Sequence, residues 1–414
     1  MIRILSGAAA AASVRKMAAR GSRYAEVEPG VRRIVADVRR RGDRAVRKYG
    51  EQWDGLAPRE SLHVTEPEIK EAWKSTAPEL KASLRTAAAN IRRFCEWQKP
   101  REWTRTRNGI TVGQIVRPLD SVGCYVPGGR YPLVSTLLMT VIPARVAGVE
   151  NIRVVSPRPK PEVLAAAGML GVSEVYRIGG AQAIAALAYG TQSIPRVDKI
   201  VGPGSLYVTV AKKLVSFDCA IDFLAGPTEV VIVSDAGTPE FIAADLVAQA
   251  EHDPEALAVF ITTRDGLARR VARAAEKLSR GNTVAHQSLR RNGIILVSAS
   301  RQQSLEWANE IAAEHLTVDA ADVALVRNAG SIFIGDDSPQ AAGDYSSGPN
   351  HVLPTGGTAR FRGGLSVLDY VKLISVQRLS GPGLKRIAPV IESLANTEGL
   401  RAHAESIRAR FDHA

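Results

Sequence analysis

The chain has 414 residues, 45% of them hydrophobic and 23% charged, which suits a globular protein of two or three domains. Its most apolar stretch, residues 132–149, is interrupted by hydroxyl side chains, a proline and an arginine, so we expect no membrane partner. The net charge is +12, but lysines and arginines are scattered and aromatic residues make up only 5%, so we interpret the charge as a solvated basic surface and expect no nucleic-acid partner.

The chain begins with a segment, residues 1–23, that is rich in arginine and alanine and has no acidic residue before Glu26. A transit peptide has this composition, and so does a short N-terminal helix. We adopt the helix and leave the targeting alternative open. Residues 26–99 have a mostly helical hydrophobic period.

The middle of the chain alternates short apolar runs with helical patterns. Parallel strands need crossover helices, so this alternation predicts a doubly wound α/β domain. The predicted strands are 121–126, 152–156, 175–178 and 199–201, and the predicted helices are 132–147, 161–170, 181–188 and 206–214.

The same alternation then starts again. Two successive runs predict two similar domains with a cleft between them, and ligands of such sheets sit beyond the carboxyl ends of the strands. The stretch 354–364 is rich in glycine and predicts a loop, and the C-terminal stretch 370–414 has a helical pattern. The strands predicted in the second run are 230–233, 258–262, 294–297 and 331–334, and the helices are 241–250, 266–278 and 302–313.

Three glycine turns follow predicted strands of the first run. Residues 202–205, Gly-Pro-Gly-Ser, end one strand and open a helix, where glycines let a phosphate approach backbone N–H groups. The turns 128–129 and 179–180 follow two other strands. Each turn is also what a tight strand-to-helix connection requires, and the usual GxGxxG fingerprint is absent. Three turns at corresponding strand ends nevertheless point to one cleft.

The three cysteines of the chain are Cys95, Cys124 and Cys219, and none forms a CxxC pair. This sparse, odd number argues against a disulfide framework and fits a reducing compartment, so we expect a cytoplasmic protein. Cys124 precedes a glycine turn, but its neighbours in the sequence supply no base or cation to lower its pKa. We therefore interpret it as a small buried residue rather than a nucleophile.

Several residues of the second run and beyond suit metal binding. Gln249 and His252 are three residues apart at the end of a predicted helix and share a face. Asp344 and His351 lie in one turn-rich loop, and His403 lies near the C-terminus. Amide, imidazole and carboxylate groups are possible zinc ligands, although a histidine at a helix end is often structural and Asp is a common turn former.

Glu314 and His315 follow a predicted helix and precede a strand. A carboxylate beside an imidazole supplies two proton-transfer groups at one point of the chain. Adjacent side chains of an extended chain point in opposite directions, so we expect the two groups to serve different atoms. A surface glutamate beside a half-buried histidine remains the structural alternative.

From about Val31 to His403 the sequence resembles the histidinol dehydrogenase family. The resemblance rests on several long segments in the same order, which are more specific than any single motif. These segments are GCYVPGG, GGAQAIAALAYGT, VDKIVGPGS, IDFLAGPTEVVIV, AQAEHDP, EHL, GDYSSGPNHVLPT and EGLRAH.

The resemblance implies a role for each matching position. Glu314 and His315 match the acid–base pair, with His315 taking protons in both oxidation steps and Glu314 activating water in the second. The implied ligands of one zinc ion per subunit are Gln249, His252, Asp344 and His403. The implied NAD contacts are Tyr125, Gln182 and Ser205. The implied substrate-binding residues are Thr228, Gln249, His252, His315, Asp344, His351, Glu398 and His403.

Two positions depart from the family pattern. Ser205 stands where the family has Asn, which puts its contact with NAD in doubt. Thr228 stands where many members have Ser, and both residues offer a hydroxyl.

The resemblance also implies an activity and an architecture. The activity is the two-step, NAD-dependent oxidation of L-histidinol through L-histidinal to L-histidine, the last reactions of histidine biosynthesis. The architecture is two Rossmann-like domains, related to those of aldehyde dehydrogenases, in a homodimer whose C-terminal tails complete the partner's sites. The corresponding segments are an N-terminal arm (1–30), a helical segment (31–105), an NAD-binding domain (106–222), a zinc and substrate domain (223–368) and a dimerisation tail (369–414).

Three other functions remain as alternatives. The first is a related zinc-dependent dehydrogenase for another amino or sulfonated alcohol, against which Glu398 and His351 argue. The second is a metal hydrolase without a nicotinamide cofactor, which would not need the glycine turns. The third is a basic nucleic-acid-binding protein, which would bind with a steep dependence on salt.

Overall fold

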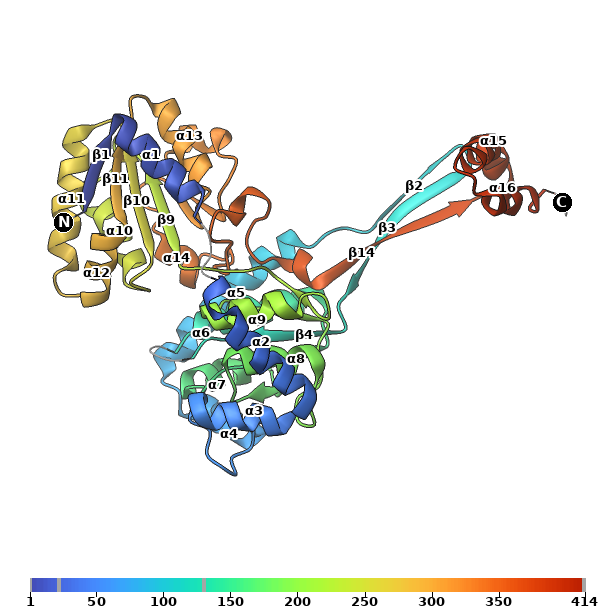
Figure 1. Cartoon of the computed structure of the whole chain (residues 1–414), viewed down its shortest axis with the longest axis horizontal. Helices are drawn as coiled ribbons and strands as arrows, with labels where there is room; N and C mark the ends of the chain where they lie inside the picture. Colours follow the sequence, from blue (N-terminus) through green and yellow to red (C-terminus); the bar gives the residue numbers. More distant parts are fainter. Residues whose placement is uncertain (1, 21–23, 129–131, 412–414) are drawn as a thin grey trace. The chain divides into compact units, whose positions relative to one another are not determined.

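The computed structural model describes residues 2–20, 24–128 and 132–411. The chain forms two compact units. We call Met1–Gln98 with Leu119–Tyr370 the main unit, and Lys99–Pro118 with Val371–Ala414 the C-terminal unit. The main unit contains two parallel sheets, which confirms the predicted α/β class with two doubly wound sheets (Figure 1).

The first sheet has five parallel strands in the order β6-β5-β4-β7-β8. β4 lies between β5 and β7, so the strand order reverses there. Ligands of open α/β sheets bind at such a reversal, at the carboxyl ends of the strands. The strands are β4 (Ser121–Tyr125), β5 (Asn151–Val155), β6 (Val175–Tyr176), β7 (Lys199–Val201) and β8 (Ala220–Ile221).

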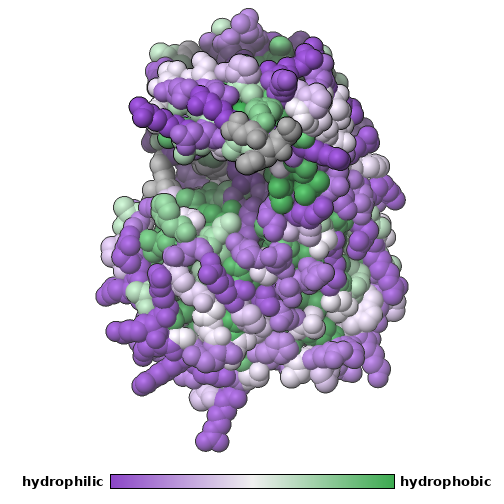
Figure 2. Space-filling view, turned by 90° about the vertical axis from the view of Figure 1, so that its right-hand side faces the viewer, coloured by the Kyte–Doolittle hydropathy of each residue, from purple (hydrophilic) through white to green (hydrophobic). Residues whose placement is uncertain are grey.

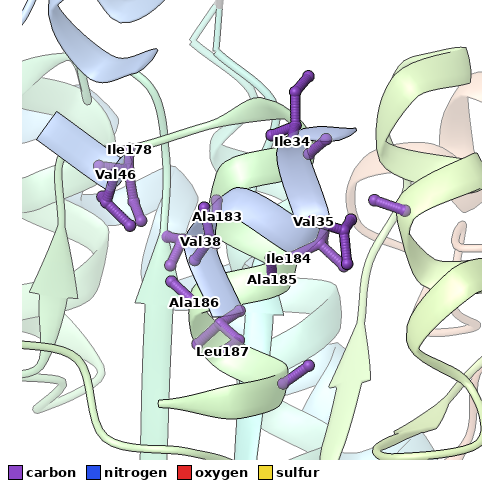
Figure 3. Packing of buried hydrophobic residues seen from close by; sticks show 14 of the residues in the cluster. Ile34, Val35, Val38, Val46, Ile178, Ala183, Ile184, Ala185, Ala186 and Leu187 are labelled. Atoms are coloured by element: carbon purple, nitrogen blue, oxygen red, sulfur yellow. The ribbon is translucent and has the colours of Figure 1, made fainter. Parts of the chain in front are cut away.

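Helices cover both faces of this sheet, as its nearly continuous apolar strands require. One face carries α2 (Tyr24–Arg41), α3 (Asp43–Tyr49), α8 (Gly180–Tyr189) and α9 (Leu206–Val215), whose apolar side chains form one buried cluster. Figure 3 shows part of this cluster, where residues of α2 and α3 meet the alanine-rich α8. The remaining helices of this part are α4 (Glu66–Ser75), α5 (Pro78–Gln98), α6 (Val134–Ala147) and α7 (Pro161–Met169), with a π-turn at Gly50–Asp54.

The second sheet has six parallel strands in the order β1-β11-β10-β9-β12-β13. Alternate residues of β9 face opposite layers: Val230 and Ile232 join one buried cluster, and Val231 and Val233 join the other. The strands are β1 (Arg3–Ser6), β9 (Glu229–Val233), β10 (Leu257–Thr262), β11 (Gly293–Val297), β12 (His315–Val318) and β13 (Ser331–Ile334).

The layers on the second sheet are also helical. The helices are α1 (Gly7–Ala18), α10 (Pro239–Ala250), α11 (Asp265–Ser279), α12 (Thr283–Arg291), α13 (Arg301–Ile311) and α14 (Gln340–Tyr345), with short 3₁₀ turns at Ala320–Leu325, Thr358–Arg360 and Val367–Tyr370. The composition of residues 1–23 predicts a single short helix, and this prediction is incomplete, because β1 pairs with β11 before α1 begins. A four-residue strand has too few residues to show a period of its own.

The C-terminal unit is an antiparallel three-stranded ribbon followed by two helices. Its elements are β2 (Trp103–Arg107), β3 (Ile110–Pro118), β14 (Val371–Leu379), α15 (Gly381–Thr397) and α16 (Arg401–Arg408). The helical prediction for 370–414 was therefore wrong over its first ten residues, because β14 pairs along its whole length with β3, a partner about 260 residues earlier in the chain.

The described residues contain no helix long and apolar enough to cross a membrane. Figure 2 shows one face of the molecule, which is mainly hydrophilic with smaller apolar patches between the polar side chains. The domain boundaries given above from the sequence stay predictions.

Candidate active site

Glu314 and His315 lie where α13 gives way to the interior strand β12. Ala312 ends α13 in the left-handed conformation, with φ of 52°, and turns the chain into the sheet. His315 is then the first residue of β12 and pairs with Val230 of β9. Both side chains are buried, which contradicts the structural alternative of a surface glutamate.

The side chains of Glu314 and His315 lie next to each other. The Glu314 carboxylate lies 3.6 Å from Nδ1 of His315. The carboxylate accepts hydrogen bonds from the Glu229 N–H, at 2.8 Å, and from the Thr228 hydroxyl. The expectation that the pair would point in opposite directions was wrong, because Glu314 lies just before β12 and does not continue its pleat.

The ring of His315 has one engaged and one available nitrogen. Nδ1 lies 3.2 Å from the carbonyl oxygen of Glu229, which assigns the proton to Nδ1 in the neutral ring. Nε2 lies 3.4 Å from the Asp344 carboxylate, yet it is buried and has no hydrogen-bond partner among the described residues. A buried polar atom without a partner is costly unless a ligand satisfies it.

Burial and neighbouring charges shift the pKa of each group in this cluster. Burial raises the pKa of Glu314 to about 7, although His315 and the hydrogen bond from Thr228 favour the carboxylate. Burial opposes the charge on His315, but Glu314 and Asp344 outweigh it and raise its pKa to about 9. The pKa of Asp344 lies below its usual value because His315 outweighs the effect of burial. Perturbed pKa values of this kind are typical of catalytic sites.

A chain of hydrogen bonds connects a predicted metal ligand to the acid–base pair. The amide nitrogen of Gln249 donates to the Thr228 hydroxyl, which in turn donates to Glu314. Because the nitrogen is engaged by Thr228, the amide oxygen of Gln249 is the atom that it can present to a cation. His252 follows α10 with an exposed side chain and interacts electrostatically with Asp344.

His351 is tied to Asp344, which lies in the short helix α14, so the sequence prediction of one loop for both residues was wrong for Asp344. Nδ1 of His351 lies 2.8 Å from the carbonyl oxygen of Asp344, and its Nε2 lies 3.3 Å from the Thr136 hydroxyl of α6. Thr228, Gln249, His315, Asp344 and His351 thus belong to one connected network, and their roles in substrate and metal binding stay predictions.

The predicted NAD residues lie at or beyond the carboxyl ends of the strands of the first sheet. Tyr125 ends β4, and its hydroxyl accepts the N–H of Gly180 at 3.0 Å. Gln182 is buried in the first turn of α8. Ser205 is the N-cap of α9 but makes no side-chain bond to the described first turn of that helix. Gly129, in the remaining predicted turn, lies outside the described residues.

A buried ion pair that sequence analysis missed holds one of these turns. The Lys212 ammonium pairs with the Asp222 carboxylate, and both side chains are almost fully buried. Lys212 also donates to the carbonyl oxygen of Gly202, at 3.1 Å, while Asp222 accepts the N–H of Gly202, at 2.8 Å. Gly202 has φ of 111°, and a Cβ there would lie 2.2 Å from the Tyr125 carbonyl oxygen. The pair therefore fixes the glycine turn beside Tyr125.

Removal of one member of this pair is expected to destabilise the protein strongly. Lys212→Met leaves the Asp222 charge buried without a partner, which typically costs about 3–5 kcal/mol. Urea denaturation, with unfolding followed by circular dichroism, measures the change. Lys70→Met is the control, because Lys70 and Glu66 form an exposed ion pair, worth about 1 kcal/mol or less. Equal effects of the two substitutions would contradict the assigned role.

Comparisons with known proteins identify the family of this chain. The family model described as histidinol dehydrogenase matches residues 17–411. The chain belongs to the histidinol dehydrogenase family. Histidinol dehydrogenase of Methanothermobacter thermautotrophicus is 48% identical over 393 residues, which cover 91% of this chain and 92% of the relative. That of Geobacter sulfurreducens is 46% identical over 402 residues, covering 93% and 94%.

A solved structure shows the same fold. The crystal structure of histidinol dehydrogenase from Elizabethkingia anophelis matches with a TM-score of 0.94 and 32% identity, over 100% of this chain and 98% of that chain. The fold of this chain is therefore that of a histidinol dehydrogenase.

Two residues implied by the family resemblance belong to the other unit of the chain. Glu398 is the C-cap of α15, and His403 lies in α16 with an exposed side chain. The other predicted substrate and metal residues belong to the main unit. In residues 2–20, 24–128 and 132–411 no three His, Cys, Asp or Glu side chains are grouped as a metal site. Two of the four predicted zinc ligands cannot contribute to such a group within the main unit. Gln249 is an amide rather than one of these four residue types, and His403 belongs to the C-terminal unit.

Proposed function

We propose that this chain oxidises L-histidinol through L-histidinal to L-histidine, reducing two NAD molecules, in the last reactions of histidine biosynthesis. Family membership makes it an NAD-dependent oxidoreductase of amino-acid biosynthesis. The observation that carries the proposal is the buried Glu314–His315 pair, with Nε2 of His315 unsatisfied by any described residue and next to Asp344.

The donor set fits a zinc ion. Gln249, His252 and Asp344 of the main unit, with His403, would supply an amide oxygen, two imidazoles and a carboxylate, which are ligand types that zinc accepts. The engaged amide nitrogen of Gln249 and the electrostatic interaction of His252 with Asp344 support this set. When bound, zinc would hold and orient the substrate and polarise its reacting group.

The side chains of the chain perform the proton transfers. In the first step Nε2 of His315 takes the proton of the carbinol hydroxyl as hydride passes to NAD. In the second step Glu314 activates the water that adds to the aldehyde, and His315 takes a proton again as a second hydride leaves. The His315 ring must be neutral to accept a proton, and a cation bound to Asp344 would offset one of the negative charges that raise the pKa of His315.

Substrate recognition would use polar groups of the main unit of one chain and of the C-terminal unit of its partner. Many family members have Ser at the position of Thr228, and both residues carry a hydroxyl. The Thr228 hydroxyl forms hydrogen bonds with Glu314 and Gln249. With Thr228, the substrate would be held by His315, His351, Asp344 and Glu398, besides the zinc ligands. Glu398 would meet the substrate's amine as an opposite charge.

The C-terminal unit supports a homodimer with shared sites. Its ribbon and helices leave many large apolar side chains exposed, which in an isolated small unit is unfavourable. We propose that a second copy of the chain covers this surface, so that His403 and Glu398 complete the partner's site. The exposed side chains are Trp103, Val112, Leu373, Ile374, Val376, Leu379, Val390, Leu394 and Leu400.

The proposed location is the cytoplasm, with no nucleic-acid partner. All three cysteines are free and buried, as expected of a protein from a reducing compartment.

Turnover of L-histidinol with NAD is expected to depend on zinc. Removal of the metal with a chelator should abolish NADH formation, and added zinc should restore it, with one zinc per active site. Full activity of demonstrably metal-free protein would contradict the metal assignment. A panel of amino and sulfonated alcohols tests the alternative substrates. A measurement that shows NAD binding would exclude a metal hydrolase without a nicotinamide cofactor.

A further inference from the structure

A buried carboxylate, Asp54, lies against the turn that carries the predicted NAD residue Gln182. Asp54 ends the π-turn after α3, and its side chain reaches the start of α8. One carboxylate oxygen accepts the N–H of Gly179 at 3.0 Å and the amide nitrogen of Gln182 at 2.9 Å. Asp54 is only 6% exposed, so these bonds form where water does not compete.

This contact determines which way the Gln182 amide faces. A carboxylate accepts hydrogen bonds, so the amide must turn its NH₂ group toward Asp54. The amide oxygen of Gln182 therefore points away from Asp54. That oxygen is buried and lacks a hydrogen-bond partner in the part of the chain that the structure describes. An unsatisfied buried acceptor is best paired with a donor on a ligand.

The same carboxylate occupies the positive end of α8. Backbone N–H groups at a helix N-terminus commonly bind phosphate. Here Gly179 gives its N–H to Asp54, and Gly180 gives its N–H to the Tyr125 hydroxyl. A phosphate at this turn would find these two donors engaged and would be repelled by the negative charge of Asp54.

We propose that Asp54 is a positioning residue of the nucleotide site. Asp54 turns the Gln182 oxygen toward an uncharged hydrogen-bond donor of NAD, either a ribose hydroxyl or the adenine amino group, and keeps phosphate away from the α8 turn. This inference rests on the proposed function, in which NAD binds at Tyr125, Gln182 and Ser205.

Steady-state kinetics of the full-length enzyme with saturating L-histidinol test the proposal. Asp54→Asn keeps the size of the side chain but can offer its NH₂ group to Gln182 and turn the amide around. The KM for NAD is expected to rise about tenfold, as expected when a hydrogen bond between two uncharged groups is lost and its donor is left without a partner, while kcat stays within about threefold of wild type, because Asp54 touches no reacting atom.

A double-substitution cycle separates positioning from a purely structural role. In a Gln182→Ala background, Asp54→Asn should raise the KM for NAD by less than about threefold, because the group that Asp54 orients is gone. An equal effect in both backgrounds would overturn the proposal. A fall in KM after Asp54→Asn would also overturn it, since that would place phosphate at α8. Thermal unfolding of each variant confirms that it is folded.

Analogues of NAD identify the donor. Replacement of adenine by hypoxanthine removes the amino group, and deoxy analogues remove the four ribose hydroxyls one at a time. One analogue should raise KM about tenfold with wild-type enzyme and have no further effect in Gln182→Ala; equal losses in both enzymes for every analogue would overturn the proposal.

Asp43→Asn is the matched control, because Asp43 belongs to the neighbouring helix α3 and bonds to Ser193 rather than to the α8 turn. It should leave the KM for NAD unchanged, and a rise equal to that of Asp54→Asn would overturn the assignment to Asp54. A wild-type enzyme that binds no NAD would instead reject the proposed function itself.

Discussion

His315→Asn is expected to lower kcat for both oxidation steps by about a hundredfold to ten-thousandfold, the usual contribution of a general base. The Glu229 carbonyl engages Nδ1 of His315, so Nε2 is the nitrogen that can take a proton. Asparagine has a similar polar end but cannot accept a proton at neutral pH. NADH formation from L-histidinol and, separately, from L-histidinal measures the two steps.

Glu314→Gln is expected to affect mainly the oxidation of L-histidinal, by a factor in the same range. The carboxylate is held by the Thr228 hydroxyl and the Glu229 N–H, and glutamine retains its size but not its ability to activate water. Glu310→Gln is the control, because Glu310 lies near the end of α13, the helix that precedes Glu314, with an exposed side chain. Normal histidinal oxidation by Glu314→Gln would contradict the assignment of the water-activating role.

Elements with a strong local signal could be predicted from the sequence. The strands Lys199–Val201 and Ser331–Ile334 have the predicted bounds, because short apolar runs between helical patterns identify parallel strands. The elements that were missed depend on distant partners. β1 pairs with β11, and β14 pairs with β3. The hairpin of β2 and β3 did carry a signal, since Asn108 and Gly109 both have positive φ and form a typical two-residue turn.

The residues of the site likewise include some that could be predicted from the sequence and some that could not. The family resemblance supplied Glu314, His315 and the Gln249 and Asp344 positions, and the structure places these in one network. It did not supply Asp54, which meets Gln182 across 128 residues of sequence. The orientation of an amide depends on its neighbours in space, and one sequence without its fold does not contain that information.

The C-terminal unit gives the last prediction. Its ribbon is exposed on both faces, with Leu373 and Ile374 of β14 both more than 40% exposed although they are adjacent and point in opposite directions. A three-stranded ribbon and two helices bury too little apolar surface to be stable alone. If a second chain covers this unit, a twofold dimer has two composite sites, each with His315 from one chain and His403 from the other.

Mixing two inactive variants is therefore expected to restore activity. His403→Ala and His315→Asn are each inactive alone, but in a mixed dimer one site carries both lesions and the other carries neither. Random pairing makes half of the dimers mixed, so about a quarter of the sites should be intact and the activity should approach about a quarter of wild type. The two proteins are unfolded together, refolded with zinc, and assayed with L-histidinol and NAD.

A second mixture shows whether the recovery comes from sharing between units. Glu314→Gln and His315→Asn both alter the main unit and both impair the second step, so every site of their mixed dimer keeps one lesion and the oxidation of L-histidinal should stay low. Differently tagged subunits, purified in sequence over both tags, show that mixed dimers have formed. If His403→Ala and His315→Asn form mixed dimers that remain inactive, then His403 serves its own subunit, because a composite site would necessarily have regained all of its residues.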